Sequence, residues 1–242
     1  MSRLICMWSG PRNLSTAMMR SFGARKDCAV YDEPFFSPFL KATGKAHPGR
    51  QETLAAHESD PQRVAMLCAE AAPNGAALYF QKHMPHHMLD GFPLDWAAEA
   101  THFFLIRHPA RVIASYAKGR ADFDAHDLGF GPQLRLYRRL EQMVGHAPPV
   151  IDSSDILAAP EAQLRSLCAA LELAWDDAML SWKSGRRETD GAWAPYWYAS
   201  VERSTGFGAP PTPRPDVPPQ YRDIYESCLA DYAALSEHKI TA

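Results

Sequence analysis

A polar loop near the start of the chain has the residue types that bind an anion. The apolar run 4–8 is typical of a buried strand, and residues 17–22 have the pattern of a helix. A strand, a tight loop and a helix N-terminus together present free backbone N–H groups and a positive dipole end, which favour a phosphate. The loop residues expected to form this cradle are Gly10, Pro11, Arg12, Asn13, Leu14, Ser15 and Thr16.

The loop differs from the Walker loop of ATP-binding proteins. No Gly-Lys-Ser/Thr follows Gly10 at the spacing that such a loop requires. Arg12 adds a cation, and Ser15 and Thr16 add hydroxyl donors. The sequence therefore indicates a phosphate site that works without the lysine and magnesium of an ATPase.

A second arginine follows another apolar run. Residues 102–106 have a strand pattern, Arg107 comes next, and Pro109 suits the first turn of a helix. Ser115 lies eight positions after Arg107, on the face of that helix. Taken alone, Arg107 is explained more simply by a carboxylate partner at a sheet edge. Together with the first loop, Arg107 and Ser115 favour a second phosphate site beside the first.

Strand-like and helix-like segments alternate along the chain. The expected strands are 4–8, 29–31, 77–81, 102–106 and 150–152, and the expected helices are 12–22, 52–71 with a break near Pro61, 110–118, 133–144 and 161–171. This alternation predicts an α/β fold. We expect one domain over 1–242, with three α/β/α layers and a mostly parallel central sheet that binds ligands at its carboxyl edge. A proline-rich surface loop over 209–219 and a closing helix over 220–237 complete it.

Composition narrows the classes of partner and compartment. The chain has 242 residues, of which 46% are hydrophobic, so it can bury one substantial core. Its formal net charge of −3 disfavours a broad nucleic-acid surface. Five cysteines without Cys-x-x-Cys spacing are typical of reduced thiols. No apolar stretch approaches the roughly 18–20 residues that span a bilayer, and no leader precedes the first strand. We expect a cytoplasmic protein without membrane or nucleic-acid partners.

These segments resemble those of the sulfotransferase family, which uses 3′-phosphoadenosine 5′-phosphosulfate (PAPS). The family's first signature is a strand followed by Pro-Lys-Ser-Gly-Thr-Thr, and residues 11–16 stand in that place. Its second is an arginine, a nearby proline and a serine eight residues on, matched by Arg107, Pro109 and Ser115. The resemblance implies that the first segment holds the 5′-phosphosulfate and the second the 3′-phosphate.

Three further segments are similar to the family. Residues 155–161 resemble its Tyr-Glu-Asp-Leu segment before a proline, and residues 81–85 resemble its Lys-Thr-His-Leu-Pro strand end. Residues 203–208 resemble the late Arg-Lys-Gly-x-x-Gly loop that covers the cofactor. Leu14 in place of a glycine and Arg12 in place of a lysine indicate a divergent, bacterial-type member. The late loop implies cofactor contacts from Ser204, Thr205, Gly206 and Phe207.

The resemblance implies metal-independent transfer of a sulfuryl group from PAPS to a small-molecule hydroxyl or, less favoured, an amine. Arg12 and the loop amides would hold the 5′-phosphate, and Lys82 would stabilise the bridging oxygen as its bond breaks. Without the resemblance, Lys82 could equally be a solvated strand end. Two rival functions stay open: a magnesium- and ATP-dependent phosphotransferase, and a non-catalytic nucleotide-binding relative.

A base must take the proton of the acceptor. Glu33, which precedes Pro34 as in carbohydrate-type sulfotransferases, ranks slightly ahead of His83; His86 and His87 are further candidates because imidazole titrates near neutrality. Glu33 could instead cap a helix opened by Pro34. The histidines could bind zinc, but no cysteine or carboxylate nearby completes a ligand set.

Aromatic residues supply a candidate acceptor pocket. Residues 193–198 are densely aromatic, and such rings can stack on a sugar or a ring, although core packing explains them as simply. The oligomeric state stays open, with a homodimer as one option. The residues expected to contact the acceptor are Phe35, Phe36, His86, His87, Trp193 and Trp197.

Overall fold

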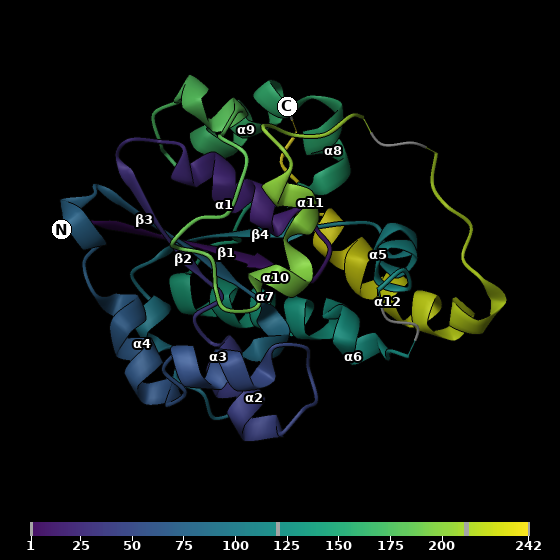
Figure 1. Ribbon diagram of the computed structural model, residues 1–242. Coiled ribbons are helices and arrows are strands. Elements are labelled where there is room, and N and C mark those ends of the chain that lie inside the picture. Colours follow the sequence, from purple (N-terminus) through teal and green to yellow (C-terminus); the bar gives the residue numbers. More distant parts are fainter. Residues whose placement is uncertain (1, 120–121, 211–212, 242) are drawn as a thin grey trace.

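A five-stranded sheet forms the centre of the molecule (Figure 1). The computed structural model describes residues 2–119, 122–210 and 213–241. The strand order is β2-β3-β1-β4-β5, and every pairing is parallel. The predicted α/β class with a parallel central sheet is therefore confirmed. The strands are β1 (Arg3–Ser9), β2 (Cys28–Asp32), β3 (Leu78–His83), β4 (Thr101–Ile106) and β5 (Val150–Asp152).

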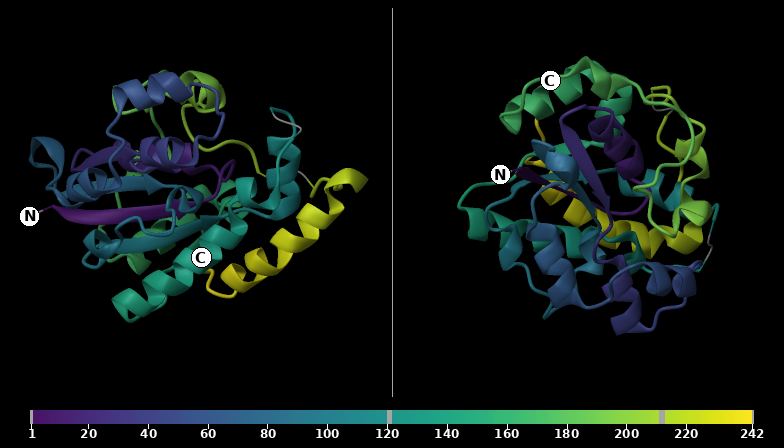
Figure 2. Two further views of the ribbon diagram at one scale, coloured as in Figure 1. Left: turned by 90° about the horizontal axis from the view of Figure 1, so that it is seen from below. Right: turned by 60° about the vertical axis from the view of Figure 1, so that its left-hand side comes forward.

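Helices cover both faces of the sheet (Figure 1). Successive strand residues point to opposite faces, so Met7 of β1 packs with Phe22 of α1 while Trp8 packs on the other side with Tyr137 of α7. Figure 2 shows α7 and α12 running side by side beneath the sheet. The layers are thus helix, sheet and helix, as predicted. The first face carries α1 (Ser15–Gly23), α8 (Ser153–Ala158) and α9 (Pro160–Ala170), and the second carries α7 (Phe130–Val144) and α12 (Arg222–Ser236).

Shorter elements surround the carboxyl edge of the sheet and its β2 side. The remaining helices are α2 (Phe36–Thr43), α3 (Arg50–Ala56), α4 (Pro61–Ala69), α5 (Pro109–Tyr116), α6 (Ala125–Leu128), α10 (Ala194–Trp197) and α11 (Ala199–Glu202). Short 3-10 turns are η1 (Pro73–Gly75), η2 (Pro85–His87), η3 (Asp95–Ala97), η4 (Asp177–Leu180) and η5 (Pro219–Tyr221). None of the helices in the described part of the chain is both long and apolar enough to cross a bilayer.

One predicted helix begins later in the structure than the sequence indicates. The helix expected from residue 12 begins only at Ser15, because Arg12 and Leu14 adopt left-handed backbone conformations, with φ of 62° and 73°, that a helix does not allow. The break expected near Pro61 in the segment 52–71 is confirmed, since α3 ends at Ala56 and α4 begins at Pro61. The late start of α1 matters for function, because it leaves residues 10–14 as a loop.

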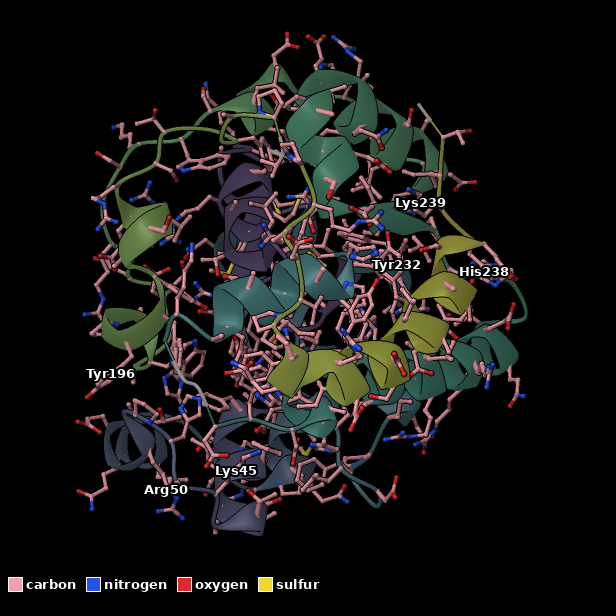
Figure 3. All side chains as sticks on the ribbon, turned by 90° about the vertical axis from the view of Figure 1, so that its right-hand side faces the viewer. Lys45, Arg50, Tyr196, Tyr232, His238 and Lys239 are labelled. Carbon is pink, nitrogen blue, oxygen red and sulfur yellow. The ribbon has the colours of Figure 1, made fainter. Side chains whose placement is uncertain are left out.

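The C-terminal helix is fastened to the carboxyl end of β5. The Tyr232 hydroxyl donates to Asp152 Oδ2 at 2.9 Å, and Lys239 Nζ donates to Asp155 Oδ2 at 2.6 Å; Figure 3 labels Tyr232 and Lys239 on this side of the molecule. Residues 209–210 and 213–218 have neither helix nor strand structure. Residues 211–212 of the predicted proline-rich loop lie outside the described residues.

Candidate active site

The carboxyl ends of the strands border a cavity of about 460 Å³. Its walls come from the segments that follow β1, β2, β3 and β4, and from α10 and α11, which lie across this edge of the sheet in Figure 1. Ligands of open parallel sheets bind at this edge because the loops after the strands meet there. The cavity is therefore the candidate ligand site of the protein.

The loop after β1 is an anion cradle. Leu14 takes the left-handed conformation that favours glycine, and α1 begins at Ser15 without a side-chain cap. The backbone N–H groups of Ser15 and Thr16 therefore have no carbonyl partner within the helix. Asn13 fixes the loop through two hydrogen bonds. Its side-chain amide donates to the Leu105 carbonyl, and its backbone carbonyl accepts from Ser153 Oγ at 3.0 Å. Residues 11–16 all line the cavity.

Gly10 lies behind the cradle rather than on the cavity wall. A Cβ atom at Gly10 would lie 3.1 Å from the Leu128 carbonyl oxygen and 3.3 Å from Asn13 Nδ2. These contacts are tighter than normal van der Waals contacts. Gly10 thus serves the loop through its small size, and the structure does not place it against a bound anion.

The two predicted anion sites share one wall. Arg12 Nε donates to Ser115 Oγ at 3.0 Å, and Arg107 Nη1 donates to the Arg12 carbonyl at 2.6 Å. The Nε atom of Arg107 is buried and has no hydrogen-bond partner among the described residues. Arg12, Arg107 and Ser115 all line the cavity. Two guanidinium groups beside free backbone N–H groups form a strongly electropositive end of this space.

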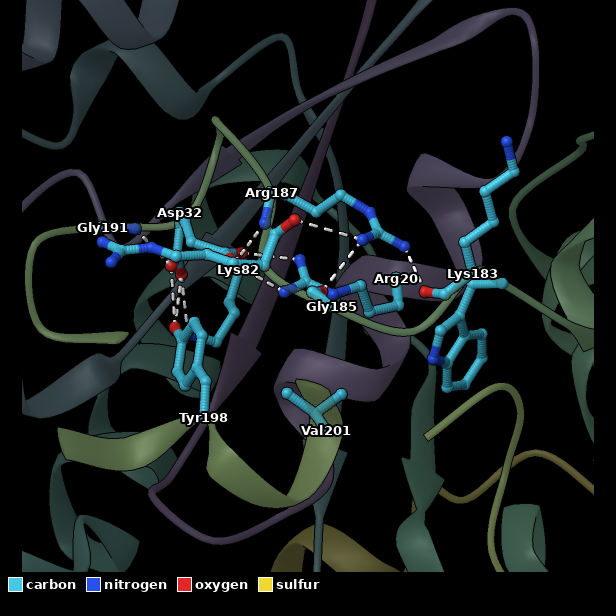
Figure 4. Close-up of polar contacts among 12 residues, drawn as sticks. Arg20, Asp32, Lys82, Lys183, Gly185, Arg187, Gly191, Tyr198 and Val201 are labelled. Atoms are coloured by element: carbon cyan, nitrogen blue, oxygen red, sulfur yellow. Dashed lines mark hydrogen bonds and ion pairs between the residues drawn. The ribbon is translucent and has the colours of Figure 1, made fainter. Parts of the chain in front are cut away.

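Three members of a buried ionic cluster (Figure 4) also line the cavity: Glu33, Lys82 and Tyr198. Lys82 Nζ donates to Asp32 Oδ1 and to the Tyr198 hydroxyl, both at 2.8 Å, and forms a close ion pair with Glu33 Oε1. Burial opposes the charge on Lys82, but the two carboxylates outweigh it and raise the pKa of this ammonium group. Lys82 is therefore a fixed cation, and the interpretation of Lys82 as a solvated strand end is wrong.

Glu33 is turned into the cavity by its backbone. Its φ of 42° is left-handed, a strained conformation that proteins keep at functional sites. Burial raises the pKa of Glu33, Lys82 opposes this rise, and the Asp32 carboxylate adds to it. The second oxygen of Glu33, Oε2, lies 3.8 Å from His87 Nδ1. Because α2 has no side-chain cap, Glu33 does not act as its capping residue.

The structure separates the candidate histidines. Lys82 and His83 are neighbours in β3, so their side chains leave opposite faces of the sheet. His83 stacks on Trp8 with ring centroids 4.5 Å apart and lies outside the cavity lining, so it does not reach a substrate there. By contrast, His86 and His87 line the cavity. Burial lowers the pKa of His86 to about 3 and that of His87 well below its usual value, so both imidazoles are neutral.

The described residues contain no group of three or more histidine, cysteine or carboxylate side chains placed to hold a metal ion. The Nδ1 atoms of His86 and His87 are buried without hydrogen-bond partners in the described structure. Neutral rings with one unused nitrogen each can instead donate to, or accept from, a polar group of a ligand.

Some of the predicted aromatic contacts line the cavity and one does not. Phe36, Trp193 and Trp197 line the cavity. Phe35 does not: it is buried against α4, with its ring centroid 5.9 Å from that of Trp96. The expectation that Phe35 contacts the acceptor is therefore not met, because neighbouring positions at the start of α2 point to different sides.

The residues of the late loop differ in whether they reach the cavity. Ser204 and Gly206 line it, whereas Thr205 and Phe207 do not. Thr205 is exposed, and its backbone carbonyl accepts from the backbone N–H of Trp182 at 3.0 Å. The Phe207 ring packs edge-on against the Trp182 ring. Half of the predicted contacts in this loop thus face the cavity.

Sequence reasoning missed two members of the ionic cluster, Asp32 and Tyr198. Asp32 is the last residue of β2 and adjoins Glu33, so its position was a usable signal. Tyr198 comes from a segment 166 residues away, and no spacing in the sequence links it to Asp32. A second buried ion pair, Arg20 with Asp190, ties the same segment to α1.

Two curated proteins resemble nearly the whole of this chain in sequence. Two Arabidopsis thaliana proteins, named branched-chain-amino-acid aminotransferase-like protein 2 and protein 1, are each 38% identical over 97% of this chain. The chain spans 42% of the length of these curated relatives. Their names describe those longer proteins.

Solved structures share the fold. A sulfotransferase from Alicyclobacillus acidocaldarius superposes with a TM-score of 0.56 at 14% identity, covering 100% of this chain and 98% of its own. The sulfotransferase domain from the curacin biosynthetic pathway gives 0.54 at 15% identity, covering 94% and 97%. At such identities the likeness shows the fold alone. The sulfotransferase domain family, however, matches residues 3–239, nearly the whole chain, and this protein belongs to that family.

Proposed function

We propose that this protein transfers a sulfuryl group from PAPS to a hydroxyl, or less favourably an amine, of a small molecule, without a metal ion. One observation carries the proposal: the anion cradle and the Lys82–Glu33 pair line the same cavity. A phosphosulfate bound at the cradle would reach a buried cation and a buried carboxylate, which are the two groups that such a transfer needs.

The residues at the electropositive end suit a donor with two phosphate groups. The free N–H groups at the start of α1 and the Arg12 guanidinium suit the 5′-phosphosulfate. Arg107 and Ser115 suit the 3′-phosphate, and the unpartnered Nε of Arg107 is a buried donor that a phosphate oxygen would satisfy.

PAPS supplies a sulfuryl group whose bond to the 5′-phosphate breaks while a bond to the acceptor oxygen forms. Glu33 takes the proton of the acceptor hydroxyl, helped by a pKa that burial raises toward neutrality. The electron pair of the broken bond stays on the phosphate oxygen, where Lys82 and Arg12 stabilise the charge. Glu33 Oε2 and His87 Nδ1 lie 3.8 Å apart, close enough to hold one acceptor oxygen between them.

Calorimetric titration tests the donor. We expect 3′-phosphoadenosine 5′-phosphate (PAP) to bind without magnesium, and AMP, which lacks the 3′-phosphate, to bind at least tenfold more weakly. Binding of ATP only, and only with magnesium, would replace the proposal with phosphoryl transfer. Binding of neither nucleotide would indicate a relative that kept the fold and lost the chemistry.

Transfer is then tested with ³⁵S-labelled PAPS and a panel of hydroxyl and amine acceptors. The expected product carries the label, and its formation continues in the presence of EDTA. The Glu33→Gln variant is the matched control, because it keeps the shape of the side chain and removes the base.

A further inference from the structure

All three N–H donors of the Lys82 ammonium group are engaged within the protein. A lysine ammonium has three donors and no acceptor. Here they reach Asp32 Oδ1, the Tyr198 hydroxyl and Glu33 Oε1 (Figure 4 shows the first two). Lys82 therefore has no N–H group left for a ligand until one of these hydrogen bonds opens.

Two of the three partners belong to a closed network. The Tyr198 hydroxyl accepts from Lys82 and from Trp193 Nε1 at 3.1 Å, and it donates to Asp32 Oδ2 at 2.7 Å. Asp32 also accepts the backbone N–H of Gly191 at 3.2 Å. Both side chains are buried, so opening either bond would take a hydrogen-bond partner from the buried Lys82 ammonium group where water cannot replace it, which is costly.

The third partner, Glu33, can lose its charge by taking up a proton. Its Oε2 atom lies toward His87 at the cavity wall, where an acceptor can reach it. When Glu33 gains a proton it loses its charge, and its attraction for the Lys82 ammonium falls. The groups that face Lys82 are the carboxylates of Asp32 and Glu33 and the Tyr198 hydroxyl, and of these Glu33 is the group that takes the acceptor proton in the proposed reaction.

We propose that Asp32 and Tyr198 are positioning residues that fix Lys82 so that only its N–H toward Glu33 can be exchanged for a donor phosphate oxygen. This inference rests on the proposed function. As Glu33 takes the acceptor proton, the Lys82 N–H that it held is released to the departing phosphate oxygen. Lys82 keeps its three protons and moves a hydrogen bond, so proton removal from the acceptor and stabilisation of the leaving group are coupled.

The test compares the removal of two tyrosine hydroxyl groups from the same segment of the chain. Tyr198→Phe removes a partner of Lys82, whereas Tyr196→Phe removes an exposed hydroxyl that bonds to Glu52 outside the cavity. The first readout is the ¹⁵Nζ signal of Lys82 in labelled protein, assigned with Lys82→Gln. We expect Tyr198→Phe to speed exchange of the Lys82 ammonium protons with water at least tenfold, and Tyr196→Phe to leave it unchanged.

The second readout separates binding from turnover, with PAPS and 2-naphthol as probes. Tyr198→Phe should lower kcat about tenfold, the effect of one hydrogen bond of about 1.4 kcal/mol, while the Kd for PAP changes less than twofold. Unchanged exchange and unchanged kcat in Tyr198→Phe would overturn the inference. If that variant does not fold, Asp32→Asn takes its place, with a lowered pKa of Lys82 as the expected signal. A failure of wild-type protein to bind PAP would defeat the proposed function, whereas the exchange measurement on ligand-free protein would still test the hold on Lys82.

Discussion

Arg107 donates a hydrogen bond of 2.6 Å to the backbone carbonyl of Arg12, so the arginine that follows β4 supports the loop that follows β1. Both guanidinium groups then face one cavity, and Ser115 closes the arrangement by accepting from Arg12. A change at Arg107 therefore acts twice, through a lost phosphate contact and through a loosened loop.

Replacing Arg107 by Gln should weaken PAP binding by about 10- to 100-fold, because a charge-assisted hydrogen bond contributes about 1.5–3 kcal/mol. AMP binding should fall less, since AMP lacks the 3′-phosphate. Ser115→Ala should show a smaller loss. Calorimetry measures all three affinities, with Arg63→Gln on the exposed surface of α4 as the control. Equal losses for PAP and AMP in Arg107→Gln would mean that the loop, and not the 3′-phosphate, depends on Arg107.

Replacing Glu33 by Gln should abolish most turnover, and its stability relative to wild type should rise with pH. Burial raises the pKa of Glu33 above its usual value of 4.5, so the folded state holds this proton more tightly than the unfolded chain. That stabilisation is full below pH 4.5 and is lost as pH rises through the raised pKa. Gln stays neutral, so its contribution to stability does not change over this pH range. Urea denaturation at pH 4 and pH 8 should therefore show Glu33→Gln gaining on wild type at the higher pH; a constant difference would show that burial does not raise this pKa.

The same protonation sets the pH dependence of activity. A general base must be ionised, so kcat/KM should fall as the solution is acidified through the Glu33 pKa, with a midpoint above 4.5. His86 and His87 cannot cause this fall in kcat/KM, because burial lowers the pKa of both imidazoles and keeps them neutral. The profile of His87→Gln should thus retain the midpoint of wild type. Loss of the acid limb in that variant would assign the base to His87 instead.

The sequence was sufficient for the sheet and the anion cradle because both depend on local signals. Apolar runs mark strands, and Pro11 to Thr16 combine a tight loop with hydroxyl and cationic residues. His83 was misplaced because the predicted strand ended at residue 81, whereas β3 runs to His83. Two more residues in the strand put Lys82 and His83 on opposite faces. The hydrogen bond from Tyr198 to Asp32 depends on how distant segments pack, which no local pattern encodes.

Leu14 supplies a test of backbone strain in the cradle. Its φ of 73° lies in the region that glycine adopts without penalty and that costs other residues about 1–3 kcal/mol. Leu14→Gly should therefore relieve strain that offsets its lost side-chain packing, leaving the free energy of unfolding within about 1 kcal/mol of wild type. Leu14→Val adds a β-branched side chain in the same conformation and should destabilise clearly. Urea denaturation compares the two; a larger loss for Gly than for Val would show that packing, and not backbone conformation, dominates at Leu14.

The Arg20–Asp190 pair should be the most sensitive structural contact of the segment that carries Trp193 and Tyr198. Arg20 donates two hydrogen bonds, of 2.6 and 2.7 Å, to Asp190, and the side chains are 3% and 0% exposed. Asp190→Asn leaves a buried guanidinium without its counter-charge and should cost about 3–5 kcal/mol. Because that segment walls the acceptor end of the cavity and not the cradle, the variant should bind PAP with near wild-type affinity while transfer to 2-naphthol falls.

The double variant Arg20→Met with Asp190→Leu separates charge from packing in this pair. It removes both charges and fills the space with apolar atoms, so most of the stability lost in Asp190→Asn should return. Denaturant unfolding of the single and double variants measures the difference. If the double variant is no more stable than Asp190→Asn, the loss comes from the geometry of the bidentate hydrogen bonds and the Asp190 contact with the Arg187 N–H, and not from an uncompensated charge.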